Sequence, residues 1–172
     1  MKHPNKNDYP AYFENYLKNV DGENPIKNLE EQKIQLCNTL MPLTDEEANY
    51  SYAEGKWSIK EIIGHLIDTE RVMSYRSMAI ARGEKQHLPG FDQDEYAKGS
   101  NFKNRELSDI LNEYQKVREA TIALFKSFDE SFYDKRGVAN KSDVTVRAVI
   151  FMIPGHEMHH LKILKEKYLN KS

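Results

Sequence analysis

The sequence predicts an all-α protein, a four-helix bundle with one long crossover between its second and third long helices. Apolar residues recur at intervals of three and four in four long segments, whereas no segment of any length alternates apolar and polar residues as a strand does. The second and third segments are separated by about twenty residues without helical periodicity. A link of this length is too long for a tight antiparallel turn, so we expect it to cross over the bundle.

Composition indicates one cytoplasmic domain over residues 1–172, long enough to bury a core without covalent staples. The formal charge of −2 does not indicate binding to nucleic acid or to a membrane surface. The apolar runs are too short to span a membrane. The N-terminus lacks the apolar stretch of a secretory signal. The single cysteine, Cys37, fits a reducing compartment, and we interpret it as a packing residue rather than a nucleophile.

The N-terminal part of the chain contains two helix starts. Asp8 precedes Tyr9-Pro10, and proline is suited to a first helical turn, so a short helical segment is expected over residues 8–20. A second start at Pro25 begins the first long helix. The four-helix core is expected to cover residues 25–169.

The second long helix, residues 59–82, has the clearest start signal in the chain. Ser58 and Glu61 have the spacing of a capping box, and Gly83 is the expected C-terminal stop. His65 lies on the flank of the apolar stripe of this helix. A histidine there is either a hydrogen-bonded packing residue or a metal ligand, and the side chains that face it decide which.

The C-terminal half contains the crossover and the other two long helices. Residues 84–105 carry the turn residues of an ordered loop, and residues 107–128 match the helical template almost without a gap. We expect a turn and loop over residues 129–142. Thr145 then caps the fourth long helix, which runs to the end of the core.

The fourth helix carries two histidines on its apolar face. His156 and His160 are four residues apart, so they lie one above the other on the same side of the helix. Together with His65 they form a set of three imidazoles with open positions, the ligand number of a catalytic rather than a closed structural metal site. Zinc suits such ligands, and so do nickel, cobalt and copper. A metal of this kind lowers the pKa of bound water to about 7 or ionises a bound thiol.

The residues next to His156 and His160 suggest further interpretations of this helix. In the string His156-Glu-Met-His159 the second histidine follows the first by three positions. The zincin motif requires a separation of four positions, so a metalloprotease is excluded. His159 is either a proton shuttle at the edge of the site or a surface imidazole. Pro154-Gly155 should interrupt helix hydrogen bonds and bend the helix just before the ligands.

Three motifs together resemble the DinB-like superfamily, and most closely the branch that includes the bacillithiol transferases. They are Tyr52-x-Glu-Gly-Lys-Trp57-Ser-Ile-Lys-Glu-Ile-Ile-Gly-His65, Leu88-Pro-Gly-Phe-Asp92, and His156-x-x-x-His160. The resemblance covers residues 40–169. It implies a four-helix bundle in which His65, His156 and His160 bind one divalent metal per chain, zinc or nickel, and it implies a homodimer.

The resemblance suggests a leading function and two alternatives. The leading hypothesis is a metal-dependent thiol S-transferase that joins a low-molecular-weight thiol, held as the thiolate on the metal, to small electrophiles in detoxification. Phe91 and Asp92 would border the electrophile pocket, and Arg76 is either the partner of a carboxylate on the thiol or a surface cation. The alternatives are a metal-dependent hydrolase of small substrates and a non-catalytic, dimeric metal-binding bundle.

Overall fold

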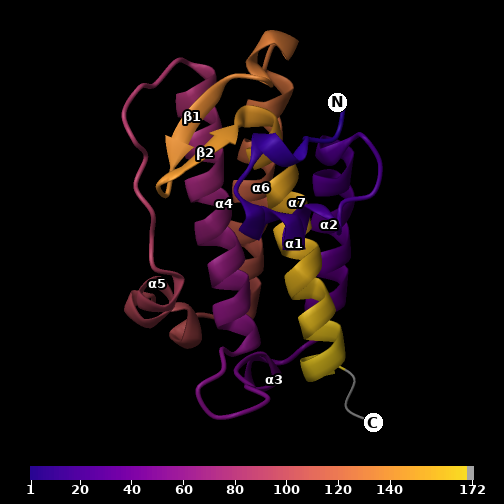
Figure 1. Cartoon of the computed structure of the whole chain (residues 1–172). Coiled ribbons are helices and arrows are strands. Elements are labelled where there is room, and N and C mark those ends of the chain that lie inside the picture. Colours follow the sequence, from indigo (N-terminus) through magenta and orange to yellow (C-terminus); the bar gives the residue numbers. More distant parts are fainter. Residues whose placement is uncertain (170–172) are drawn as a thin grey trace.

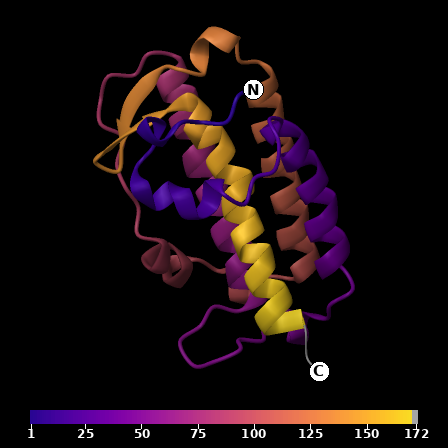
Figure 2. The ribbon, with the colours of Figure 1, turned by 45° about the vertical axis from the view of Figure 1, so that its right-hand side comes forward.

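The computed structural model, which describes residues 1–169, confirms the four-helix bundle (Figures 1 and 2). Its long helices are α2 Pro25–Leu40, α4 Ile59–Ala81, α6 Leu107–Lys126 and α7 Val146–Ile163. After α7 the chain continues as a π-helical segment, Leu164–Leu169. Helix α4 packs against both α6 and α7, and α2 packs against the same two helices. None of the helices in residues 1–169 has the length and apolar character needed to cross a bilayer.

The helix starts lie where the local sequence places them. In α4 the Ser58 hydroxyl accepts the Glu61 N–H at 3.3 Å, and the Glu61 carboxylate accepts the Ser58 N–H at 2.7 Å. This capping box satisfies two N–H groups that would otherwise lack partners. Gly83 follows the helix with a φ of +91°, a conformation that favours glycine. Thr145 caps α7 by accepting the Ala148 N–H at 3.2 Å.

The N-terminal segment lies across the bundle and forms less regular structure than expected. It contains 3-10 turns at Lys6–Asp8 and Ala11–Phe13 and one short helix, α1 Glu14–Leu17. Helix α1 packs against α7, as both ribbon views show. Another short helix, α3 Asp45–Ala48, connects α2 to α4.

The expected turn and loop over residues 129–142 is wrong in part, because a β-hairpin forms there after a 3-10 turn at Glu130–Phe132. Strands β1 Arg136–Ala139 and β2 Ser142–Thr145 pair antiparallel. The two residues between them both have positive φ, the conformation of a type I′ hairpin turn. Each strand has only four residues, too few for the sequence alternation to be visible.

The crossover between α4 and α6 is ordered and contains a helix that periodicity did not reveal, α5 Gln93–Gly99, followed by a 3-10 turn at Phe102–Asn104. Leu88 attaches its start to the hairpin, donating its N–H to Val138 at 2.8 Å and accepting the Asn140 N–H at 3.0 Å. Phe102 attaches its end to α4, where a Cβ on Gly64 would lie 2.2 Å from the Phe102 ring. The glycine therefore allows the crossover to pack directly on the helix that carries His65.

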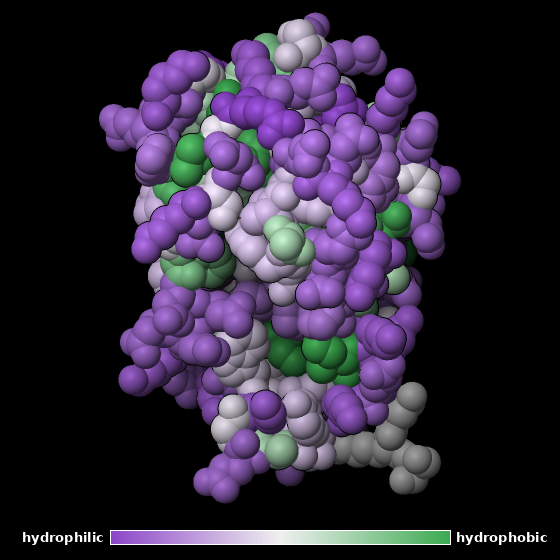
Figure 3. Space-filling model, viewed as in Figure 1, coloured by the Kyte–Doolittle hydropathy of each residue, from purple (hydrophilic) through white to green (hydrophobic). Residues whose placement is uncertain are grey.

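The core consists of two apolar clusters with a polar layer between them. One cluster contains the C-terminal half of α4 and the N-terminal half of α7, and the other contains the opposite halves of these helices. Buried polar side chains occupy the middle of both helices and of α6. They are His65, Thr69, Glu70, Arg118, Thr121, His156 and Glu157. The outer face in Figure 3 is mostly hydrophilic, with a prominent apolar group below its centre and smaller ones at the upper left and on the right.

Candidate metal centre

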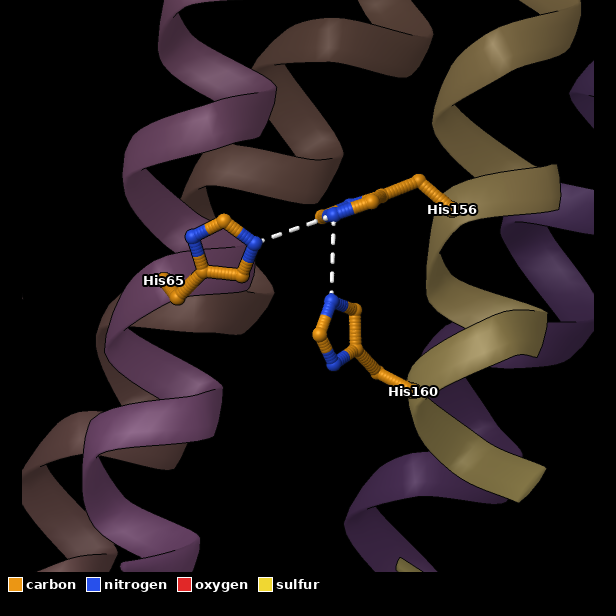
Figure 4. A group of neighbouring side chains, drawn as sticks. All are labelled: His65, His156 and His160. Carbon is orange, nitrogen blue, oxygen red and sulfur yellow. Dashed lines mark hydrogen bonds between the residues drawn. The ribbon is translucent and has the colours of Figure 1, made fainter. Parts of the chain in front are cut away.

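Three histidines meet in the polar layer, with their rings directed toward one another from two helices (Figure 4). The Nε2 atom of His156 lies 3.0 Å from Nε2 of His65 and 3.1 Å from Nε2 of His160. One ligand atom from each ring lies within 4.8 Å of the other two. The structure therefore brings together the three residues that the sequence predicted as metal ligands.

The arrangement of these nitrogens fits a divalent cation. Metal–nitrogen bonds of about 2.0–2.1 Å separate two ligands by about 2.9 Å at a right angle and by about 3.3 Å at the tetrahedral angle. The two measured nitrogen–nitrogen distances fall within this interval. A neutral imidazole nitrogen carries either one proton or one lone pair, so Nε2 of His156 can form only one good hydrogen bond. It has two nitrogen neighbours, those of His65 and His160, and a shared cation would satisfy all three atoms better.

Burial keeps the three imidazoles neutral, which is the form that binds metals. The exposed fractions of His65 and His156 are 6% and 5%. Burial lowers the pKa of His65 to about 4, and burial together with the neighbouring His65 and His159 lowers the pKa of His160 to about 3. The pKa of His156 is shifted well downward for the same reason. At neutral pH the free site therefore needs no proton release before a metal binds.

Neighbouring side chains fix the orientation of the rings. The Thr69 hydroxyl lies 3.4 Å from Nδ1 of His65, and the Trp57 ring lies 4.9 Å from the His65 ring, centroid to centroid. Tyr16 of α1 packs edge-on against His156, with centroids 5.2 Å apart. The helical wheel of α4 also places the acidic residues Glu61 and Asp68 near His65. Glu61 instead caps α4, and Asp68 lies beside Arg71.

Glycine 155 allows this contact between α1 and α7. The helix continues through Pro154, and a Cβ on Gly155 would lie 2.3 Å from the backbone oxygen of Tyr16. A backbone atom cannot rotate away as a side chain can, so any larger residue would push α1 outward. Gly155 thus has a packing role that the sequence did not predict, in a helix that continues through Pro154.

A buried ionic network lies directly beside the three histidines, and sequence reasoning missed it. Arg118 of α6 is paired with Glu70 of α4, at 2.8 Å, and with Glu157 of α7. Tyr114 donates its hydroxyl to both oxygens of Glu157, at 2.8 and 2.9 Å. Burial opposes the charge of Arg118, but the two carboxylates outweigh it and raise its pKa further. Burial also raises the pKa of Glu157, against the opposing effect of Arg118.

A sequence signal for this network existed. Arg118 lies four residues after Tyr114 and four before Ile122, so it continues the apolar stripe of α6. A charged residue on such a stripe is buried and needs a partner of opposite charge. The sequence does not show which acid supplies it, because that depends on how the helices pack.

A pocket opens beside the histidines on the side of His160. It has a volume of about 240 Å³. The last turns of α7, the start of α4 with the loop before it, and α5 form its wall. The lining residues are Tyr52, Gly55, Lys56, Trp57, Ile62, Asp94, His160, Ile163 and Tyr168. Polar and apolar side chains share the wall, as is usual for small-molecule sites. The pocket thus reaches the ring of His160, the third histidine of the cluster.

The other predicted site residues lie apart from this pocket. Arg76 and Phe91 line a different cavity, and Arg76 is eleven residues from His65, about 16 Å along the helix. Asp92 caps α5, accepting the Asp94 and Glu95 N–H groups at 2.9 and 3.1 Å. His159 packs its ring against Tyr16 and against His160, with centroids 5.5 and 5.2 Å apart.

Curated relatives carry names that refer to metal-dependent hydrolysis. A protein of Oceanobacillus iheyensis, OB0413, is 26% identical over 86% of this chain and 85% of its own length and is named a candidate metal-dependent hydrolase. YfiT of Bacillus subtilis, with a name of the same kind, is 22% identical over 82% of this chain and 80% of its own length.

Solved structures share the fold. That of YfiT, described as a four-helix bundle of unusual topology, has a TM-score of 0.72 at 19% identity and covers 83% of this chain and 82% of its own. A mycothiol-dependent maleylpyruvate isomerase has a TM-score of 0.67 at 10% identity and covers 86% of this chain and 61% of its own. Residues 29–164 match the DinB superfamily, so the chain belongs to that family.

Proposed function

We propose that this protein is a metal-dependent hydrolase of small substrates. The observation that carries the proposal is the set of three neutral imidazoles, two buried and one half-buried, beside a pocket that reaches His160. Three protein ligands leave a position for water or substrate, which distinguishes a catalytic from a structural site. The names of the two curated relatives support hydrolysis over the alternatives.

The side chains have distinct roles in this proposal. His65, His156 and His160 would hold one divalent ion, and zinc or nickel suits an all-imidazole set. When bound, such an ion would supply Lewis acidity and would lower the pKa of bound water to about 7. Asp94 is the acidic residue in the pocket wall, and we assign it the role of general base. Lys56 in the same wall supplies a positive charge for an anionic transition state.

A second candidate is thiol S-transfer, in which a low-molecular-weight thiol replaces water as the nucleophile. The shared fold with an isomerase that is named as mycothiol-dependent supports it as the second candidate after hydrolysis. The same three histidines would hold a metal ion to which the thiolate would bind, and the pocket at Trp57 and Tyr52 would receive the electrophile. His159, at the edge of the site, is then the candidate proton shuttle. In either reaction we expect the protein to work in the cytoplasm as a homodimer.

One assay with two substrates tests these candidates. Metal-loaded protein is mixed with a p-nitrophenyl ester, or with monobromobimane and a small thiol such as cysteine, and each rate is compared with the same concentration of free metal. Ester hydrolysis that needs no thiol supports the hydrolase, and thiol conjugation without ester hydrolysis supports the transferase. Asp94→Asn should slow hydrolysis about a hundredfold without loss of metal. Rates equal to those of free metal in both assays would leave only a non-catalytic metal-binding bundle.

A further inference from the structure

A second cavity, of about 270 Å³, lies between α4 and the start of the crossover. Its wall contains Arg76 and Tyr75 of α4 together with Leu88, Pro89, Phe91 and Tyr96. It shares no lining residue with the pocket at His160. The Phe91 and Tyr96 rings lie 5.1 Å apart and form an aromatic side to the cavity. The cavity is therefore a separate, largely apolar space with a cationic side chain in its wall.

Arg76 is buried without a counter-ion. Its exposed fraction is 4%, and it donates to the Pro89 carbonyl at 2.5 Å and to the sulfur of Met73 at 3.7 Å. No carboxylate of residues 1–169 forms an ion pair with it. Buried charges in proteins are normally paired, as the equally buried Arg118 is with two acids. Burial also lowers the pKa of Arg76, the expected effect on a cation without an anion.

The hydrogen bond from Arg76 to the Pro89 carbonyl of the crossover does not by itself explain why this residue is an arginine. A guanidinium has five N–H donors in a planar fork, and the Pro89 carbonyl uses one of them. A neutral amide would form that bond without burying a charge. Arg71, at the rim of the same cavity, is different, because it is half exposed and already pairs with Glu113 at 2.7 Å. Arg76 thus has donor capacity that the protein does not use.

We propose that this cavity binds a small organic carboxylate with an aromatic or apolar body. The carboxylate pairs with the guanidinium of Arg76, whose planar fork matches two oxygens, and the body lies against Leu88, Phe91 and Tyr96. The volume limits the ligand to about one ring with a short substituent. Because Arg76 is about 16 Å along α4 from His65, such a ligand occupies its own site and does not reach the metal. The proposal is independent of the reaction at the histidines.

Benzoate and its neutral isostere benzamide test the site on the full chain. We expect benzoate to shift the amide signals of Leu88, Gly90 and Phe91 in NMR titrations, and benzamide to bind at least about tenfold more weakly. The same benzoate affinity is expected with metal and after chelation by EDTA. Equal binding of the two compounds would overturn the proposal. So would loss of benzoate binding on chelation, because benzoate would then occupy the metal.

Substitutions at Arg76 separate ligand binding from attachment of the loop. Arg76→Gln keeps a donor for the Pro89 carbonyl but removes the charge, and should weaken benzoate binding about tenfold or more while leaving benzamide unchanged. Arg82→Gln makes the same charge change just after α4, outside the cavity, and should retain wild-type affinity. If Arg76→Gln fails to fold, Arg76→Lys keeps the charge and should retain the preference for benzoate over benzamide. Wild-type benzoate affinity in folded Arg76→Gln would refute the site.

Discussion

Arg118 pairs with Glu157, the residue that follows the candidate metal ligand His156 in α7. The same guanidinium pairs with Glu70, five residues after His65 in α4, and donates to the Leu29 carbonyl of α2 at 3.1 Å. One side chain of α6 therefore touches the other three long helices at the level of the histidines. Two of these helices carry the three clustered histidines, so the network fixes their relative position.

We expect Arg118→Met to lower the free energy of unfolding by about 3–5 kcal/mol, measured by urea denaturation of the metal-free protein. The substitution fills similar space but leaves two buried carboxylates without their cation, which is the costly way to break a buried ion pair. Adding Glu70→Gln and Glu157→Gln removes the unpaired charges and should recover more than half of the loss. A loss below about 1 kcal/mol in Arg118→Met would show that the network contributes little to stability.

The fold was predictable because its signals are local. The capping box at Ser58, the Gly83 stop and the Thr145 cap each act within one helical turn, and the structure confirms all three. The hairpin over residues 136–145 was not predictable in the same way. Its strands are too short for periodicity, and its place depends on Leu88 of the crossover, about fifty residues earlier in the chain.

The metal centre was only partly predictable, for a similar reason. The helical spacing of His156 and His160 puts them on one face, and the order of the helices makes His65 their partner. Their surroundings depend on contacts between distant segments, as with Tyr16 beside His156 and Asp94 in the pocket of His160. Neither position carries a sequence signal, because each is set by how a short helix packs on the bundle.

Metal content tests the ligand set directly. The purified protein should bind about one divalent metal per chain, and His65→Ala or His156→Ala should reduce this to a small fraction by elemental analysis. His159→Ala is the matched control, because its ring contacts His160 but does not belong to the converging group. It should bind metal like the wild type. Full occupancy in His65→Ala would remove that residue from the site.

Gly155→Ala tests the packing of α1 on α7. Alanine normally favours a helix over glycine, yet a Cβ here would lie 2.3 Å from the Tyr16 backbone oxygen. We therefore expect a loss of about 1–3 kcal/mol in the free energy of unfolding, with NMR shifts at Tyr16 and His156. Gly99→Ala, at the end of α5, meets nothing within 4 Å and should change stability by less than about 0.5 kcal/mol. A stabilised Gly155→Ala would show that α1 does not approach this closely.

The lowered histidine pKa values predict how acid affects the metal-free protein. The pKa of His65 is lowered from 6.5 to about 4, and that of His160 to about 3, chiefly by burial. As the pH falls below 6.5, the unfolded chain therefore binds protons that the folded site does not, and stability decreases until the folded-state pKa values are reached. Above pH 6.5 these groups are neutral in both states and add no pH dependence.

Urea denaturation between pH 7.5 and 5.0, after EDTA treatment, measures this effect. His65 and His160 should each contribute up to about 1.4 kcal/mol of destabilisation per pH unit below 6.5. His65→Asn removes one of the three imidazoles, His65, His156 and His160, whose pKa is lowered in the folded chain, so its stability should fall less steeply with acid than that of the wild type. His87→Asn removes an exposed histidine of the crossover and should keep the wild-type slope. Equal slopes in all three proteins would mean that the buried imidazoles are protonated as readily as those of the unfolded chain.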